Sequence, residues 1–303
     1  MATATQAVPL PSSGTRRRKQ ALIGWAFLMP SLIIFVFFRH LPAIAGLGLG
    51  LFNWSVMGAP SFVGLENYVN LARDPVFWIA LKNTAVYTVM AVPVDVAVSL
   101  ALAHLLNQRL PGLRFFRMAF FIPFLTSTAV VALVWHALYL PDGPINIILS
   151  GMHLPAPNWL GDPRFALAAI AVMAVWKHLG FNILVFLAGL QAIPPELEEA
   201  GRIDGAGSFA LFRCVTMPLL KPVLLVVIIL TTIDSFQVFD AAYVMTQGGP
   251  FYATTTMVFY VYQLAFIQFQ MGYAAAVGFE LFMIILSVSI LQRWLLRGEI
   301  HAY

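Results

Sequence analysis

The most informative shortage in this sequence is charge. Only 10% of its 303 residues are Asp, Glu, Lys or Arg, whereas 60% are hydrophobic and the mean hydropathy is +0.85. An ordinary soluble domain carries about 25% charged residues, so this composition indicates an integral membrane protein. The apolar runs are long and unbroken rather than short and alternating, which excludes a transmembrane β-barrel and predicts an all-α fold.

Cysteine is nearly absent as well. Cys214 is the only one, so the chain can form no internal disulfide and has no paired-thiol metal motif. His104, His136 and His178 share no metal-ligand spacing, and we expect no metal site. The sequence has no Gly-x-x-x-x-Gly-Lys-Ser/Thr motif, so we expect the chain to bind no nucleotide cofactor of its own.

Six apolar stretches are present that approach or exceed the length needed to cross a membrane, which takes about 20 residues. Six crossings would place both termini on one side. A basic run precedes the first stretch as in a signal peptide, but no cleavage site is obvious, so we expect the first helix to be retained. The expected tails are residues 1–20 and 298–303, with the membrane domain at 21–297 between them. The stretches cover residues 21–38, 78–106, 115–140, 165–192, 219–243 and 272–296.

Basic residues gather on one side of this topology. Twelve lie in the termini and the loops assigned to one face, while the opposite side holds only Arg39, Arg73 and Arg164. By the positive-inside rule, both termini and the loop at residues 193–218 are expected in the cytoplasm. The same rule explains the net charge of +4 without a nucleic-acid partner.

The loop at residues 193–218 is the longest polar interruption between two apolar stretches. It holds four of the thirteen acidic residues. Pro195 followed by carboxylates is typical of a helix start, because proline suits the first turn and carboxylates complement the helix dipole. Gly205 and Gly207 predict a tight turn, after which Ser208 would cap a second short helix. We expect this loop to fold as helix, turn and helix.

The residues alone leave two roles open for this loop. Two short amphipathic helices could insert into a groove of a partner protein, and the small side formed by Ala200 and Gly201 would allow close approach. Alternatively, the helices could lie on the lipid surface. The excess of acid in the first helix disfavours that role where the lipid is anionic.

The loop resembles the EAA loop of permease subunits in binding-protein-dependent ABC importers. Glu199 matches the leading glutamate of that motif and Gly205 its central glycine, whereas Gly201 departs from the usual second alanine. The resemblance covers about residues 20–297, and its flanking segments resemble the sugar and glycerol-phosphate branch, of the MalF and UgpA type. The docking residues that it implies are Glu199, Ala200, Gly201, Asp204, Gly205, Ala206, Phe212 and Pro218. The flanking segments are Trp176-Lys177, Ser235–Asp240 and Thr246–Pro250.

This resemblance implies a MetI-like fold of six transmembrane helices in the bacterial cytoplasmic (inner) membrane. The chain would form half of a pore, paired with a second homologous permease subunit. Two ATP-binding subunits would hold ATP and Mg, and an extracytoplasmic solute-binding protein would deliver the solute. The cytoplasmic loop would then be the coupling helix, and the chain itself would be driven mechanically and not be an enzyme.

Ionisable residues inside membrane spans are costly and usually functional. Asp234, Gln237, Asp240 and Tyr243 recur every third residue, which suits a helix that crosses a pore obliquely or, alternatively, a polar seam with the second permease. In the preceding span, Trp176 and Lys177 are expected nearer the substrate path, unless Lys177 pairs with Asp234 or Asp240. Such groups bind sugars or related polyols, including oligosaccharides and glycerol-phosphate derivatives.

Two further acids bear on a competing class. Asp95, after Pro93, and Glu280, among small residues, are each consistent with helix packing. Together with Asp234 they could instead form the proton relay of a secondary transporter. A membrane enzyme is a third class, but it would need a nucleophile or a metal site that the sequence does not show.

Overall fold

The computed structural model describes residues 13–55, 58–108 and 112–296. The chain divides into two compact units, residues 1–49 and 50–303. The expected tail at 298–303 and residues 1–12 of the other tail lie outside the described part.

The first unit is a single helical run. It comprises α1 (Ser13–Phe35), the π-helical turn η1 (Val36–His40) and α2 (Leu41–Leu49). The helix begins before the expected start at residue 21 and continues past Pro42, because the wide turn absorbs the proline. None of the described residues from Arg17 to Leu49 is buried against the rest of the chain. The apolar surface of this helical run is therefore left for lipid or another chain.

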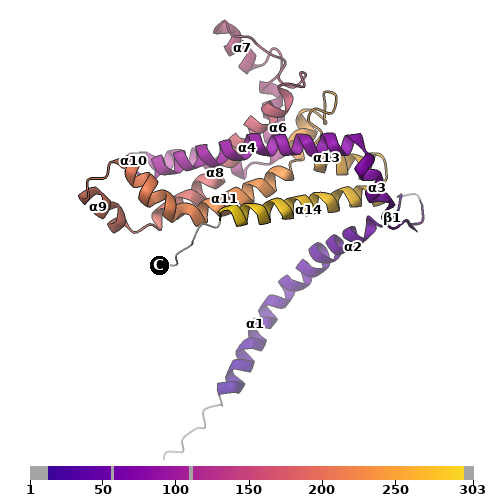
Figure 1. Ribbon diagram of the computed structural model, residues 1–303, viewed down its shortest axis with the longest axis horizontal. Helices are drawn as coiled ribbons and strands as arrows, with labels where there is room; N and C mark the ends of the chain where they lie inside the picture. The colour runs from indigo at the N-terminus through magenta and orange to yellow at the C-terminus, as the bar shows by residue number, and fades with distance from the viewer. Residues whose placement is uncertain (1–12, 56–57, 109–111, 297–303) are drawn as a thin grey trace, which may run out of the picture. The chain divides into compact units, whose positions relative to one another are not determined.

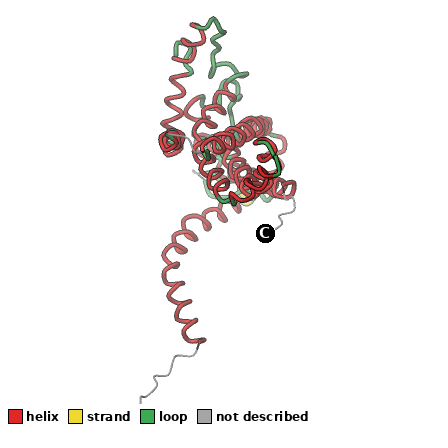
Figure 2. The backbone as a smooth tube through the Cα atoms, turned by 90° about the vertical axis from the view of Figure 1, so that its left-hand side faces the viewer, coloured by secondary structure: helices red, strands yellow, loops and turns green. Residues whose placement is uncertain are grey.

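The described residues of the second unit form helices, connecting loops and one small hairpin, which confirms the all-α class (Figure 2). The hairpin pairs β1 (Phe52–Asn53) with β2 (Ser61–Phe62) in antiparallel order. Its helices are α3 (Glu66–Arg73), α4 (Pro75–Leu106), α5 (Leu113–Leu125), α6 (Thr128–Leu138), α7 (Pro144–Gly151), α8 (Ala166–Gln191), α9 (Pro195–Ile203), α10 (Ser208–Leu211), η2 (Phe212–Thr216), α11 (Met217–Phe236), α12 (Asp240–Met245), α13 (Met257–Tyr262), η3 (Gln263–Ile267) and α14 (Met271–Leu296).

Five helices of the described chain are long and apolar enough to cross a membrane, and α5 with α6 makes a sixth if the bent pair is one span. The two helices meet at 101°, so the stretch expected as a span at 115–140 is a bent pair of helices and not one continuous helix. Thr126 is extended, and its amide bonds to the carbonyl of Pro123 instead of continuing the helix. The span expected at 219–243 is also wrong in its limits, because the helix covers Ser208 to Phe236.

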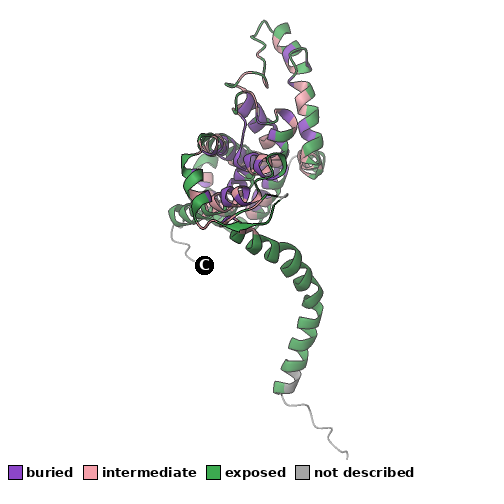
Figure 3. Cartoon of the chain, turned by 90° about the vertical axis from the view of Figure 1, so that its right-hand side faces the viewer, coloured by how far each residue is buried: buried purple, intermediate pink, exposed green. Residues whose placement is uncertain are grey.

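The long helices α4, α8, α11 and α14 lie side by side, with α4 contacting both α8 and α11 (Figure 1). Their shared core includes Ile183, Phe186, Leu220 and Val227. Buried residues line the inward faces of this bundle, while its periphery is exposed (Figure 3). Helices α9 and α10 lie at one end of the bundle, and α3 and β1 lie at the other (Figure 1).

Asp74 ties three helices together at the α3 end. One carboxylate oxygen accepts from the backbone amides of Val76, at 2.8 Å, and Phe77, at 3.4 Å, and so caps α4. The other accepts from the hydroxyls of Tyr260 on α13 and Tyr273 on α14. Burial alone would raise the pKa of Asp74, but these hydrogen bonds outweigh it and lower the pKa.

Replacing Asp74 with alanine is expected to destabilise the chain by about 4 kcal/mol or more, because the cap and both tyrosine hydrogen bonds are lost. The helix cap contributes about 1 kcal/mol, and each hydrogen bond to a charged group contributes about 1.5 to 3 kcal/mol. Thermal unfolding in detergent measures the loss. Asp142, an exposed acid in the α6–α7 loop that forms no side-chain hydrogen bond with another described residue, serves as the control, since its alanine variant should unfold like the wild type.

The pH dependence follows from the lowered pKa of Asp74. A depressed folded-state pKa stabilises the fold above the unfolded value, about 3.9, and the stabilisation is lost as the pH falls through the folded value. The difference in stability between the wild type and Asp74→Ala should therefore be constant from pH 5 to 8 and shrink only below about pH 4. A difference that already shrinks between pH 7 and 5 would contradict this assignment.

Candidate functional site

The predicted docking loop begins as expected. Pro195 lies in the first turn of α9, and the helix ends at Ile203 with Asp204 as its C-cap. Gly205 has a φ of 82°, the left-handed conformation that glycine adopts without steric cost. The amide of Ala206 closes the turn on the carbonyl of Gly201 at 2.9 Å. The helix start and the tight turn are confirmed.

The second half of the loop differs from the expectation. Ser208 does not cap α10, since Gly207 occupies the cap position without a side-chain hydrogen bond. Helix α10 continues through η2 into α11 as one helix from Ser208 to Phe236. The amide of Met217 reaches back to Phe212 in the π-helical turn, so Pro218, which lacks an amide hydrogen, is accommodated without a break. The second short helix is therefore the first part of a membrane helix.

Several of the predicted docking residues are available to a partner. Glu199, Ala200, Asp204 and Gly205 are exposed, and neither acid forms a hydrogen bond or ion pair with another described residue. Ile203, which the sequence reasoning missed, is 86% exposed one turn after Glu199. Its spacing of four residues from the glutamate is the signal that would have found it.

The remaining docking residues are structural. A side chain at Gly201 would meet Leu211 at 2.5 Å, so the glycine lets α9 pack against α10. Phe212 is half-buried, and its ring lies edge-on to His104 of α4 at 5.3 Å between centroids. Pro218 is exposed within the long helix. These residues fix α9 relative to the bundle.

A polar cavity of about 100 Å³ lies beside the end of α11. It forms because the helix stops at Phe236 and residues 237–239 are non-helical before α12 begins. This break turns consecutive backbone and side-chain groups toward α4, α6 and α8. The lining residues are Tyr87, Thr128, Ala174, His178, Asp234, Gln237, Val238, Phe239, Asp240 and Ala241.

A close contact between an imidazole and a carboxylate crosses this cavity. Nδ1 of His178 on α8 lies 3.2 Å from Oδ2 of Asp234 on α11. Tyr87 is buried at the wall, whereas the side chains of Gln237 and Asp240 are exposed. The cavity therefore presents an imidazole, two carboxylates, an amide and a phenol to one space. These groups can donate and accept hydrogen bonds to a hydroxylated solute.

The predicted row of polar residues is brought together, but not on one helix. Asp234, Gln237 and Asp240 all line the cavity, while the expectation of a single oblique helix is wrong. Tyr243 lies outside the lining, where its ring stacks on Phe239 at 5.4 Å between centroids and 19° between planes. Tyr262 approaches it at 5.3 Å, so the tyrosine belongs to an aromatic cluster next to the cavity.

The two residues of α8 that were expected nearer the substrate path do not line this cavity. Trp176 packs against Trp135 at 5.6 Å between centroids, and Lys177 is buried with its Nζ 5.6 Å from the ring centroid of Phe124. Neither lines the cavity, and no ion pair joins Lys177 to Asp234 or Asp240 among the described residues. His178, expected in the core or at the membrane interface, occupies the position instead.

Deeper in the same bundle lies a second polar group. Asp95 is 2% exposed and accepts a hydrogen bond from Ser99 at 2.8 Å. The amide of Asn182 on α8 donates to Thr231 on α11 at 3.1 Å. The first contact lies within α4 and the second joins α8 to α11, and the burial of Asp95 beside a partner on its own helix favours the packing role.

Comparison with known proteins adds to this geometry. The family model for "binding-protein-dependent transport system inner membrane component" matches residues 22–300. A trehalose/maltose transport system permease protein MalF from Thermococcus litoralis is 37% identical, over 90% of this chain and 92% of that protein. A lactose transport system permease protein LacF from Rhizobium radiobacter is 34% identical, over 94% of this chain and 98% of that protein.

The fold also has solved counterparts. A chain of a bacterial ABC transporter involved in the import of the acidic polysaccharide alginate aligns with a TM-score of 0.82, covering 95% of this chain and 99% of that one at 22% identity. A chain of the alginate transporter in complex with an alginate pentasaccharide-bound periplasmic protein aligns at 0.80, covering 93% and 96% at 22% identity. At this identity the likeness concerns the fold.

Proposed function

Because this chain belongs to the family of binding-protein-dependent transport system inner membrane components, we propose how its two candidate sites serve transport. The chain is a multi-pass inner-membrane permease subunit of a sugar ABC importer, and it is not itself an enzyme. In this proposal, α9 is the docking element for an ATPase subunit and the cavity at Asp234 lies on the sugar path.

One observation carries the proposal. The helix from Ser208 to Phe236 is continuous, with α9 next to its first residue and Asp234 in its last turn. A rigid helix transmits displacement along its length. Movement of α9, which packs on Leu211 at Gly201, would thus be passed along this helix to Asp234 and to the break at residues 237–239.

The cavity chemistry suits a sugar or related polyol. Carboxylate, amide and imidazole groups hydrogen-bond hydroxyls, and the stacked rings of Phe239 and Tyr243 offer a surface for the apolar face of a sugar ring. Ligand pockets usually measure about 300 to 1,000 Å³, so the cavity is one wall of a larger site. The second homologous permease subunit would supply the opposite wall.

The remaining partners follow from what the chain does not carry. The sequence has no phosphate-binding motif, so two separate ATP-binding subunits would hold ATP and Mg and hydrolyse the nucleotide. Glu199 and Ile203 would contact one of them. An extracytoplasmic solute-binding protein would deliver the sugar, as the complex of the alginate transporter with its periplasmic protein suggests. Under this arrangement both termini are cytoplasmic.

Reconstitution of the assembled transporter in proteoliposomes tests the proposal. Uptake of a radiolabelled sugar such as maltose or trehalose should require ATP and the binding protein, and should survive collapse of the proton gradient. Uptake that continues without ATP and stops with the proton gradient would instead support the secondary transporter.

The cavity itself is tested by Asp234→Asn. The variant keeps the size of the side chain but removes the charge that faces His178 at 3.2 Å, so we expect ATP-dependent uptake to fall at least about tenfold, the equivalent of about 1.4 kcal/mol. Copurification of the ATPase subunits should be unchanged. Asp142→Asn, an exposed acid in the α6–α7 loop, is the matched control. If Asp234→Asn takes up sugar at the wild-type rate, the cavity does not lie on the sugar path.

A further inference from the structure

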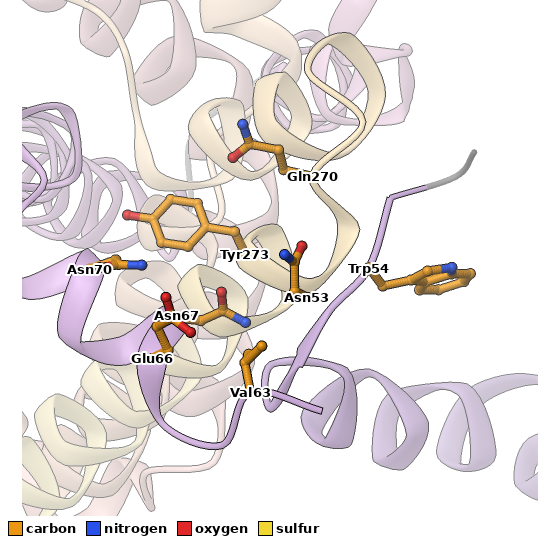
Figure 4. A pocket seen from close by; sticks show the side chains of 8 residues that line it. All are labelled: Asn53, Trp54, Val63, Glu66, Asn67, Asn70, Gln270 and Tyr273. Carbon is orange, nitrogen blue, oxygen red and sulfur yellow. The ribbon is translucent and has the colours of Figure 1, made fainter. Parts of the chain in front are cut away.

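A second polar hollow lies at the end of the bundle that is opposite α9. It measures about 370 Å³ between the β-hairpin, α3 and the first turn of α14. Figure 4 shows the side chains of Asn53, Glu66 and Asn67 around the same space as the ring of Tyr273. Asn70 and Gln270 complete its polar lining. None of these residues takes part in the cavity at Asp234.

The floor of this hollow is held rigidly. Asn67 is 8% exposed, and its Nδ2 donates to the carbonyls of Gly50 at 2.8 Å and Phe52 at 3.0 Å. Both amide hydrogens are thus occupied, and Oδ1 remains as an acceptor. That oxygen has no partner among the described residues and is not enclosed, so it is open to the hollow. A fixed amide oxygen of this kind is a preorganised hydrogen-bond acceptor.

The aromatic wall is equally fixed. The hydroxyl of Tyr273 donates to Asp74 at 2.8 Å, so its ring cannot rotate freely. The amide of Gly272 donates to the carbonyl of Trp54 at 3.2 Å, and a side chain at position 272 would meet the carbonyl of Phe52 at 1.9 Å. The strand and the helix are therefore locked together around the space.

The composition of the lining identifies the chemistry of the ligand. Four carboxamides, one carboxylate and two aromatic rings line the hollow, and no lysine or arginine does. Carboxamides both donate and accept hydrogen bonds, as neighbouring sugar hydroxyls do, and a ring face suits the apolar side of a sugar. The volume falls within the usual range for ligand sites, about 300 to 1,000 Å³. The lone carboxylate, Glu66, disfavours an acidic sugar.

We propose that this hollow is a second sugar site, which binds a neutral sugar at the extracytoplasmic end of the permease without help from the binding protein. The assignment of this end to the outside rests on the proposed function, whereas the binding itself does not. A sugar bound in the hollow would occupy a position between the binding protein that delivers it and the helical bundle that it enters.

Saturation-transfer difference NMR on the assembled transporter in nanodiscs tests the proposal, with no ATP and no binding protein. Maltose and trehalose are the probes, and glucuronic acid is the acidic comparison. We expect saturable signals from the neutral sugars and weaker signals from glucuronic acid. The double variant Asn53→Ala with Gln270→Ala should reduce the neutral-sugar signals at least about fivefold. Gln268→Ala, an exposed amide two residues away, should leave them unchanged.

A third variant, Asp240→Asn, separates this site from the membrane cavity. Binding in the hollow does not involve Asp240, so the substitutions Asn53→Ala and Gln270→Ala should reduce the signals by the same factor when Asp240→Asn is also present. Loss of the signals in Asp240→Asn but not in the double variant would place the sugar in the cavity and overturn the proposal. Absence of saturable signals in the wild type would also overturn it. So would a double variant that binds sugar normally but associates less with the binding protein, because the hollow would then be a protein docking surface.

Discussion

Replacing Glu199 with lysine is expected to abolish sugar uptake while leaving the chain folded and inserted in the membrane. The side chain is exposed and bonds to no described residue, so the substitution removes nothing from the fold. Its effect must come from a partner. Like charges brought together in an interface cost several kcal/mol, and about 3 kcal/mol already weakens binding more than 100-fold.

Two measurements check this expectation together. ATP-dependent uptake should fall to background, and a tagged variant should no longer copurify the ATPase subunits, while its unfolding temperature stays at the wild-type value. The control is Asp142→Lys, an identical reversal of charge at an exposed acid in the α6–α7 loop, which should leave uptake and copurification intact. Normal uptake by Glu199→Lys would show that α9 does not dock through this face.

The long helices could be predicted from the sequence for a physical reason. A backbone in lipid must satisfy its own hydrogen bonds, so apolar length alone forces a helix, as in α4, α8 and α14. The start of α9 and the turn at Gly205 could also be predicted from the sequence, because proline and glycine act through local backbone geometry. These features depend on neighbours in the sequence only.

The helix breaks could not be predicted in the same way. The apolar stretches expected from the sequence run through the ends of α5 at Leu125 and α11 at Phe236, because the polar residues at each end are too few to interrupt a stretch of membrane length. Proline was an ambiguous signal. Pro123 precedes a break of 101°, whereas Pro218 lies in a continuous helix because a π-helical turn accommodates it. Tertiary packing decides between these outcomes.

The candidate site shows the same limit. Asp234, Gln237 and Asp240 could be selected because intramembrane polar residues are costly and therefore informative. Whether Lys177 or His178 faces the cavity depends on how α8 is rotated about its axis. The neighbouring helices set that rotation, so the sequence of α8 alone does not give it. One residue corresponds to about 100° of rotation, and this is enough to turn Lys177 toward Phe124 and His178 toward Asp234.

That rotation depends on a close approach between α5 and α8. An added Cβ at Gly180 would lie 2.2 Å from the carbonyl oxygen of Phe120 and 2.8 Å from the Cα of Phe121. Both atoms belong to the backbone of α5, so no side-chain rotation relieves the overlap. Gly180→Ala is therefore expected to push the two helices apart and to destabilise the chain by about 3 kcal/mol, at the upper end of the usual cost of overpacking.

The damage should extend to transport, because Phe124 of α5 packs beside His178, which lines the cavity. Phe124 stacks on Phe181 at 5.1 Å between centroids and faces His178 at 6.5 Å. A displaced α5 moves Phe124 and loosens the position of His178 opposite Asp234. Gly180→Ala should therefore lower both the unfolding temperature and the uptake, whereas Asp234→Asn should lower uptake alone.

Gly278→Ala is the matched control, since it makes the same substitution in the membrane helix α14 where no atom lies within 4 Å of the added carbon. Alanine favours helix over glycine by up to about 1 kcal/mol, so this variant should unfold at or above the wild-type temperature and transport normally. If Gly180→Ala behaves like Gly278→Ala in both measurements, then α5 does not approach α8 at Gly180, and the orientation of His178 must be set by other contacts.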